Sequence, residues 1–245
     1  MDPAFYRYRQ EVESKLKRAF LQEREIKLAA KWVSESIRDK GWIYVSGTGH
    51  SHMMAEEIFY RTGGFARVIP VLDPDLMLHI SASNSTMVER QEGYAHDLLK
   101  SYPITEKDVF FIFSNSGRNP VTIEMAMYAQ EKEARVISIT NFIQSKTLDS
   151  RHSSEQMLFQ VSDLFLDNCG EIGDAAIDIE GVPIKVGPTS TVIGAALIQA
   201  IMVQAVENLV ELGVDPEIFK GANDGDTDQP VDSLVEKYKK QVKGL

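Results

Sequence analysis

Two short polar segments of the sequence hold residue types that bind phosphate, and each stands between an apolar run and a helical pattern. The first, residues 47–51 (GTGHS), has two glycines that permit a tight turn, and the hydroxyls of Thr48 and Ser51. The second, residues 114–119 (SNSGRN), follows the apolar run VFFIF and offers two hydroxyls and two side-chain amides at the start of a helix. A helix N-terminus favours anions, and an ordinary helix cap needs only one such residue. The second segment therefore predicts a phosphate-binding loop.

The first segment by itself has two interpretations. Its G-x-G sequence could open a dinucleotide-binding fold, with Asp73 after the next apolar run as the acid that binds the ribose. However, His52 stands where the third glycine of that fingerprint belongs. A nicotinamide-dependent dehydrogenase is therefore an alternative that the serine-rich second segment argues against.

Strand-like and helix-like patterns alternate along the chain. Such alternation implies parallel strand pairing, so we expect an α/β fold with a doubly wound sheet and helices on both faces. Both polar segments would then lie outside the carboxyl ends of the strands, where such sheets bind ligands. Strands are expected at residues 42–46, 66–72, 108–113, 135–140, 161–166 and 182–186, and helices at 5–37 (one helix or two joined end to end), 50–61, 86–100, 119–131, 191–212 and 231–243, with an acidic loop at 223–230.

Further short matches point to a family. Residues 187–191 (GPTST) are similar to the P-T-S-S/T segment of arabinose-5-phosphate isomerases, and residues 73–79, which end in Leu-His, match the same family. Ala55-Glu56-Glu57 is similar to phosphoheptose isomerases, and Glu92-Gly93 with residues 97–98 and 116–118 resembles N-acetylmuramic acid 6-phosphate etherases. Over residues 40–212 the chain thus resembles the sugar isomerase (SIS) domain, closest to an uncharacterised group of such proteins.

This resemblance implies a flavodoxin-like core of five parallel strands that binds a phosphorylated sugar, a carbohydrate derivative. With no repeat or linker in the sequence, we expect one domain over residues 1–245: a helical segment 1–40, a core 41–212 and a tail 213–245. Asn115 and Asn119 depart from the family, because many relatives carry Thr and Ser there, and the last long helix lacks the histidine of phosphoheptose isomerases. The residues implied in binding the phosphate or the sugar are Ser51, Ser114, Asn115, Ser116, Asn119, Thr189, Ser190 and Thr191.

Isomerisation of an aldose to a ketose moves a proton between adjacent carbons, so it needs a positioned base and an acid that opens the sugar ring. Glu57 and Glu92 match carboxylates of the family and are the candidate bases. A carboxylate beside a bound phosphate is expected to have a raised pKa. His79 is the candidate acid, with a buried structural histidine as the alternative. The expected function is phosphosugar isomerisation, and the alternatives are an etherase acting on an amino-sugar phosphate and a phosphosugar sensor without catalysis.

Composition limits the partners of the chain. The net charge of −10, with Lys and Arg scattered, disfavours nucleic acid and anionic membranes, and no run approaches the ~18 uninterrupted apolar residues of a membrane span. The single Cys169 suits a reducing compartment, so a cytoplasmic location is expected. No cofactor is expected. No metal is expected either, because His52 and Glu56 form a pair at ligand spacing without a third partner. The apolar first and last long helices predict a homo-oligomer, most simply a two-fold dimer.

Overall fold

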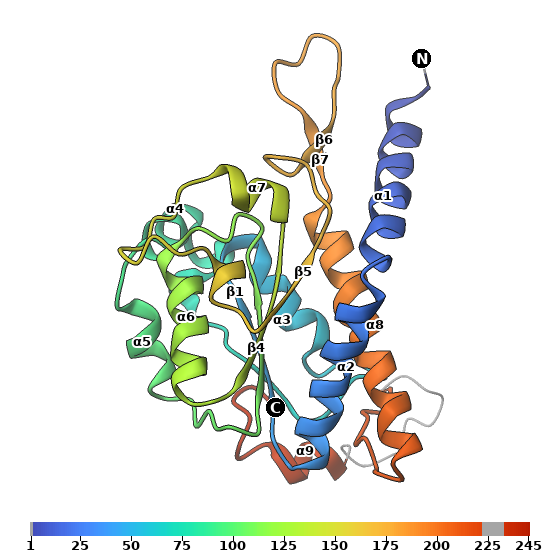
Figure 1. The fold of residues 1–245 in the computed structure, drawn as a ribbon, viewed down its shortest axis with the longest axis vertical. Helices are drawn as coiled ribbons and strands as arrows, with labels where there is room; N and C mark the ends of the chain where they lie inside the picture. The colour runs from blue at the N-terminus through green and yellow to red at the C-terminus, as the bar shows by residue number, and fades with distance from the viewer. Residues whose placement is uncertain (1, 222–232) are drawn as a thin grey trace.

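The structure is a computed structural model that describes residues 2–221 and 233–245, and its core is a five-stranded sheet (Figure 1). The strand order is β2-β1-β3-β4-β5, and all neighbouring strands are parallel. This confirms the expected α/β class, and the order is that of a flavodoxin-like sheet. The strands of this sheet are β1 (Ile43–Gly47), β2 (Val68–Pro70), β3 (Val109–Phe113), β4 (Arg135–Thr140) and β5 (Leu164–Asp167).

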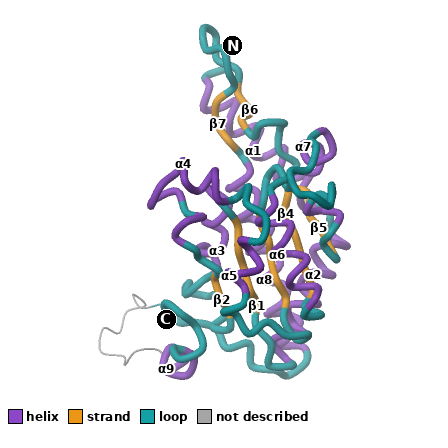
Figure 2. The backbone as a smooth tube through the Cα atoms, turned by 90° about the vertical axis from the view of Figure 1, so that its left-hand side faces the viewer, coloured by secondary structure: helices purple, strands orange, loops and turns teal. Residues whose placement is uncertain are grey.

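Helices cover both faces of the sheet, as expected (Figures 1 and 2). One layer consists of α1 (Ala4–Phe20), α2 (Glu23–Arg38), α3 (Met53–Ile58) and α8 (Ser190–Glu211). The other consists of α4 (Leu78–Val88), α5 (Tyr94–Leu99), α6 (Pro120–Glu131) and α9 (Ser233–Tyr238). The short helices η1 (Gly49–His52), η2 (Pro74–Leu76), α7 (Phe142–Thr147) and η3 (Leu158–Gln160) lie in the connections.

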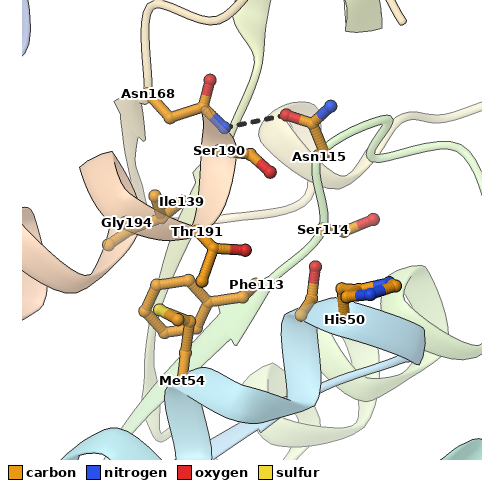
Figure 3. A pocket seen from close by; sticks show the side chains of 11 residues that line it. His50, Met54, Phe113, Ser114, Asn115, Ile139, Asn168, Ser190, Thr191 and Gly194 are labelled. Carbon is orange, nitrogen blue, oxygen red and sulfur yellow. Dashed lines mark hydrogen bonds between the residues drawn. The ribbon is translucent and has the colours of Figure 1, made fainter. Parts of the chain in front are cut away.

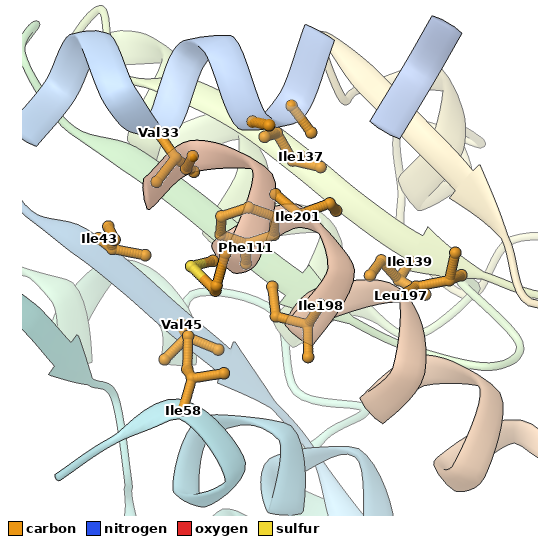
Figure 4. Packing of buried hydrophobic residues seen from close by; sticks show 14 of the residues in the cluster. Val33, Ile43, Val45, Ile58, Phe111, Ile137, Ile139, Leu197, Ile198 and Ile201 are labelled. Atoms are coloured by element: carbon orange, nitrogen blue, oxygen red, sulfur yellow. The ribbon is translucent and has the colours of Figure 1, made fainter. Parts of the chain in front are cut away.

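Each central strand is buried on both faces, which explains its uninterrupted apolar sequence. In β3, Phe111 and Phe113 belong to the core under α2 and α8, whereas Phe110 and Ile112 belong to the core under α5 and α6. The division follows from the two-residue period of a strand. Figure 4 shows the first core, where Phe111 lies among side chains of β1, β4 and α8.

The segment expected as one helix over residues 86–100 is broken, and this expectation was wrong. α4 ends at Val88 and α5 begins at Tyr94, with Gly93 between them at a φ of 83°. Glycine adopts this left-handed conformation at little cost, and a helix cannot continue through it. The break puts Glu89 and Glu92 in a loop that contacts α6, rather than on the solvated side of a helix.

The N-terminal apolar pattern forms two helices, because the chain turns at Leu21 and Gln22 between α1 and α2. The first part of α1 extends beyond the sheet and lies beside an antiparallel hairpin of β6 (Ala175–Ile177) and β7 (Val186–Pro188) (Figures 1 and 2). There the Tyr8 hydroxyl donates to the Pro188 carbonyl at 2.8 Å. The strand expected at residues 182–186 was misplaced, because residues 178–185 form the hairpin loop and pairing resumes at Val186.

Two other helices end earlier than expected. The helix expected over residues 50–61 begins as η1 and ends at Ile58, and the final helix ends at Tyr238. The acidic segment at residues 223–230 and the expected start of the final helix, residues 231–232, lie outside the described residues.

α8 is the one helix of residues 2–221 and 233–245 that is long and apolar enough to cross a membrane by length and composition. Two glutamines, Gln199 and Gln204, interrupt its apolar sequence. Its buried side chains, among them Leu197 and Ile201, pack between α2 and the sheet, and a core helix of this kind passes the same test as a membrane span. The length and apolar composition of this helix are therefore weak evidence for a membrane span.

Candidate functional site

A pocket of about 310 Å³, counting its open mouth, lies at the carboxyl ends of β1, β3 and β4 (Figure 3). Most of this volume is open to solvent, and the enclosed part is about 30 Å³, well below the roughly 300–1,000 Å³ of small-molecule sites. Its lining comes from η1 and the start of α3, from the end of β3 and the loop after it, from β4, from the loop after β5 and from the first two turns of α8. The lining residues are His50, Ser51, Met54, Phe113, Ser114, Asn115, Ile139, Asn168, Ser190, Thr191 and Gly194.

The pocket brings together five of the eight residues that the sequence implied in binding: Ser51, Ser114, Asn115, Ser190 and Thr191. They come from three polar segments that are far apart in the sequence. Two of the segments follow β1 and β3, whose carboxyl ends lie at one edge of the parallel sheet. The third follows β7 of the separate antiparallel hairpin and begins α8, which packs on the five-stranded sheet. The other three residues, Ser116, Asn119 and Thr189, stand in the same segments but do not line the pocket.

The loop after β3 is held in a defined conformation. Gly117 has a φ of 60°, and the Ser114 hydroxyl accepts from its backbone N–H at 3.1 Å. The Ser145 hydroxyl donates to the Ser116 carbonyl at 2.9 Å. A Cβ at Gly117 would lie 3.1 Å from both the Ser145 and Thr140 hydroxyl oxygens, so both the conformation and the space favour glycine there. The Ser116 hydroxyl forms no hydrogen bond with the residues that the structure describes.

The two asparagines of this loop bond outside their own segment. The Asn115 side-chain oxygen accepts from the Asn168 amide at 2.8 Å, and Asn168 also lines the pocket (Figure 3). Asn119 is buried and precedes α6, yet its side chain does not cap the helix and instead accepts from the Arg151 guanidinium at 2.8 Å. Neither Asn168 nor Arg151 belongs to a motif, so sequence reasoning missed both.

The segment before α8 is already occupied by an acidic residue. The Asp174 carboxylate accepts from the backbone N–H groups of Thr189 and Ser190 at 3.0 and 2.8 Å, and from the Ser190 hydroxyl at 2.5 Å. Thr189 is fully buried, and its hydroxyl finds no partner among the described residues. A carboxylate at a helix N-terminus occupies the position that an anionic ligand would otherwise take.

Glu89 is a carboxylate that sequence reasoning missed, because a continuous helix was expected around it. Its Oε2 accepts from the Thr48 hydroxyl at 2.6 Å, and its backbone carbonyl accepts from the Val121 N–H in the first turn of α6. Glu89 thus connects the loop after β1 to the helix that follows the phosphate-binding segment. The signal in the sequence was Gly93, four residues later.

A group of arginines lies near Glu89 and Asn119. Burial lowers the pKa of Arg151, and the positive charges of Arg118 and Arg90 lower it further, while Glu89 opposes them. The Arg118 Nε is buried and bonds no described residue. Arg90, Arg118 and Arg151 thus bring positive charge to the region of Glu89 and Asn119, which suits a phosphate ligand.

None of the three catalytic residues that the sequence suggested lines the pocket. Glu57 accepts from Arg61 at 2.8 Å and from Gln199 at 3.0 Å, on the outer part of α3. Glu92 accepts from the hydroxyl and the backbone N–H of Ser153, and these bonds lower its pKa instead of raising it.

His79 is exposed, so the alternative of a buried structural histidine was wrong. Its ring centroid lies 6.2 Å from that of His52, the buried histidine at the end of η1. His50 is the histidine that lines the pocket itself.

Comparison with known proteins agrees with this fold. Residues 7–141 match the family model of the SIS domain, and the chain belongs to the SIS-domain family. Within it, the chain is 40% identical over 236 residues to the UPF0309 protein of Geobacillus thermodenitrificans (strain NG80-2), which covers 96% of this chain and 95% of the relative. The name of this relative states no activity.

Two solved structures are similar in fold. A phosphoheptose isomerase from Francisella tularensis matches 84% of this chain and 100% of its own, with a TM-score of 0.53 and 13% identity. The Vibrio vulnificus NanR protein complexed with ManNAc-6P matches 87% of this chain and 66% of its own, with a TM-score of 0.50 and 18% identity. At these identities the likeness concerns the fold.

Proposed function

We propose that this protein binds a phosphorylated sugar in the pocket at the carboxyl ends of β1, β3 and β4 and isomerises it between aldose and ketose. The observation that carries the proposal is the meeting of Ser51, Ser114 and Asn115 in one pocket, next to a loop that is flanked by arginines. Hydroxyls, loop amides and nearby arginines together suit a dianionic phosphate. The SIS family and the structures similar in fold, a phosphoheptose isomerase and a complex with ManNAc-6P, support this ligand class.

The phosphate is placed on the loop after β3 in this proposal, not at the N-terminus of α8. The Ser116 hydroxyl is free of bonds to the described residues, and Arg151 is already bonded to Asn119 at the end of that loop. At α8, in contrast, Asp174 holds the backbone N–H groups and would repel the phosphate. Thr191 and His50 would then face the sugar from the two sides of the pocket.

Isomerisation needs a base that removes a proton from the carbon next to the open-chain carbonyl and returns it to the neighbouring carbon. Glu89 is the carboxylate that meets the loop after β1 and the helix after the phosphate loop, so we place this role on Glu89. A hydrogen bond from Thr48 orients it. Glu57 and Glu92, the bases proposed from the sequence, bond to Arg61 and Ser153. None of the three carboxylates lines the pocket, and Glu89 is preferred because its partner Thr48 directly precedes η1, which does line it.

The deciding experiment incubates the protein with sugar phosphates in deuterated water. An isomerase incorporates deuterium at the carbon beside the carbonyl and interconverts aldose and ketose. An etherase acting on N-acetylmuramic acid 6-phosphate releases lactate instead. Tight phosphosugar binding in calorimetry without exchange or release would overturn catalysis and leave a sensor. Equal affinity for a sugar and its phosphate would overturn the phosphate site itself.

We also propose that the protein is a homodimer. Large apolar side chains stay exposed on two helices and in the hairpin loop: Val203 is 69% exposed on α8, Phe5 67% on α1 and Ile184 71% in the hairpin loop. A second copy would cover such surfaces by a two-fold interface. Light scattering at micromolar concentration should give twice the chain mass of 27.5 kDa. A measured mass of one chain would contradict the proposal.

A further inference from the structure

Three side chains with metal-ligating atoms meet beside the phosphate loop. Glu92 of the loop between α4 and α5, Glu124 of α6 and His152 of the loop after α7 each offer a ligand atom within 4.8 Å of the other two. No two of them are closer than 28 residues in the sequence, so no motif spacing indicates the group. Among residues 2–221 and 233–245 this is the one cluster of its kind.

The ligand atoms are oriented by a second set of hydrogen bonds, as in protein metal sites. Both Glu92 oxygens accept from Ser153, through its backbone N–H at 2.6 Å and its hydroxyl at 2.8 Å. Glu124 Oε1 accepts from the Gly93 N–H at 2.6 Å. His152 Nδ1 accepts from the Ser154 backbone N–H at 3.1 Å and lies 2.7 Å from the Ser154 hydroxyl. The neutral ring therefore has its proton on Nε2, and this proton must leave Nε2 before that atom can bind a cation.

A separate observation points to a missing partner. Glu124 Oε2 is buried and has no hydrogen-bond partner among the described residues. An unpaired buried carboxylate oxygen is unfavourable. The His152 Nε2 lies 3.7 Å from Glu124 Oε1, beyond hydrogen-bond distance, and the two side chains are only 10% and 14% exposed. Two carboxylates converge here without a Lys or Arg bonded to either of them among the described residues.

We propose that Glu92, Glu124 and His152 bind a first-row divalent cation, Zn²⁺ or Mn²⁺, and that the ion clamps the three segments behind the phosphate loop. One imidazole and two carboxylates suit such ions, whereas Ca²⁺ and Mg²⁺ prefer oxygen ligands alone. In tetrahedral geometry, ligand distances of about 2.1 Å put the ligand atoms about 3.4 Å from one another. The three ligand atoms here lie within 4.8 Å of one another, so they would move closer together to bind the ion. The exposed Glu92 leaves an entry path and an open position for water.

The position of the site gives the ion a role. Each ligand follows a residue of the proposed site. Glu92 follows Glu89, which bonds Thr48 of the loop after β1. Glu124 follows Asn119 of the phosphate loop, and His152 follows Arg151, which bonds Asn119. Fixing the three ligands would fix Arg151 against Asn119 and hold the loop that carries Glu89. A metal at this site would contradict our expectation that the chain binds no metal, which rested on the sequence spacing of possible ligands.

The test uses the full chain, stripped with a chelator, and titrates Zn²⁺ and Mn²⁺ separately in a calorimeter without any sugar. We expect one ion per chain for at least one of the two metals, and at least about 100-fold weaker binding in Glu124→Gln and His152→Gln. Glu131→Gln, at the exposed end of α6, and His96→Gln, an exposed histidine of α5, are matched controls that should bind as the wild type does.

Circular dichroism establishes that the variants fold, and a Co²⁺ titration gives a second measurement, since its visible absorption reports the coordination geometry. The bound ion should raise the melting temperature of the wild type and not of His152→Gln. The proposed site would be wrong if neither Zn²⁺ nor Mn²⁺ bound at one ion per chain. It would also be wrong if Glu124→Gln and His152→Gln both bound the metal as the wild type does. Because no sugar is present, such a result would leave the proposed function standing.

Discussion

Two helix N-termini of this protein have similar residue compositions but bond to side chains of opposite charge. The segment before α6 and the segment before α8 are both rich in Ser, Thr or Asn and both follow a strand. Before α8, the Asp174 carboxylate holds two backbone N–H groups and the Ser190 hydroxyl. Before α6, the Asn119 side chain is bonded to a cation, Arg151.

A hydroxyl-rich sequence at the start of a helix identifies a place where an anion could bind. The surrounding charges decide whether an acidic side chain of the protein already occupies that place. At α8 the Asp174 carboxylate caps the helix N-terminus. This segment therefore lines the pocket without binding an external anion. At α6 the nearby charged group bonded to the helix start is a cation, Arg151, so an external phosphate is favoured there. The following predictions test this difference.

The largest effect is expected at Glu89, on the α6 side of the comparison. Glu89→Gln removes the base but keeps the shape of the side chain and the contact with Thr48. Turnover should fall by ~10²–10⁴-fold, while calorimetry should show phosphosugar affinity within a few-fold of the wild type. Glu57→Gln, whose side chain bonds Arg61 and Gln199, is the matched control and should keep turnover. Full activity in Glu89→Gln would return the role to Glu57 or Glu92.

The two segments should differ in binding when one serine of each is replaced. Ser116→Ala should weaken phosphosugar binding by about 1–3 kcal/mol, because it removes a hydroxyl from a charged ligand. Ser190→Ala should weaken it by less, since that hydroxyl is bonded to Asp174. Isothermal titration with one sugar phosphate measures both. Equal losses of affinity in the two variants would contradict the proposed difference between the two helix starts.

Asp174 itself should act on stability and not on affinity. Asp174→Asn weakens three hydrogen bonds at the N-terminus of α8 and removes the charge that complements the helix dipole. The free energy of unfolding should fall by about 0.5–2 kcal/mol, as measured by denaturant titration. Phosphosugar affinity should be unchanged or higher, because a repulsive charge has gone. A loss of affinity as large as that of Ser116→Ala would contradict an internal capping role.

The smallest effect is expected from the acid titration of Glu92, measured in chelator. Hydrogen bonds from Ser153 lower its pKa below the ordinary value of 4.5, so the ionised form stabilises the fold. This contribution is complete above the unfolded pKa and is lost as the pH falls through the lower folded pKa. Between pH 5 and pH 3 the melting temperature of Glu92→Gln should therefore decrease less than that of the wild type. Parallel curves would show that Ser153 does not hold Glu92 in solution.

The sequence by itself determined the architecture and the positions of the polar loops. Runs such as VFFIF are typical of central strands buried on both faces, and their alternation with helical patterns indicates parallel pairing. Parallel strands end at one edge, so the loops after β1 and β3 had to meet there, and Ser51 and Ser114 do line one pocket. These conclusions depend on local periodicity, which a sequence displays directly.

The charges near the pocket are placed by contacts that form in the folded chain. The expected helix is broken between Val88 and Tyr94, with Gly93 in a left-handed conformation, and in this loop Glu89 bonds Thr48 and Glu92 bonds Ser153. Arg151 and Asp174 stand in segments without a motif, and they reach Asn119 and Ser190 through space. Electrostatic interactions depend on distance between atoms and on burial, and neither quantity is encoded in spacing along the chain. The sequence could therefore place the phosphate-binding loop, but the charges that distinguish it from the start of α8 emerge with the fold.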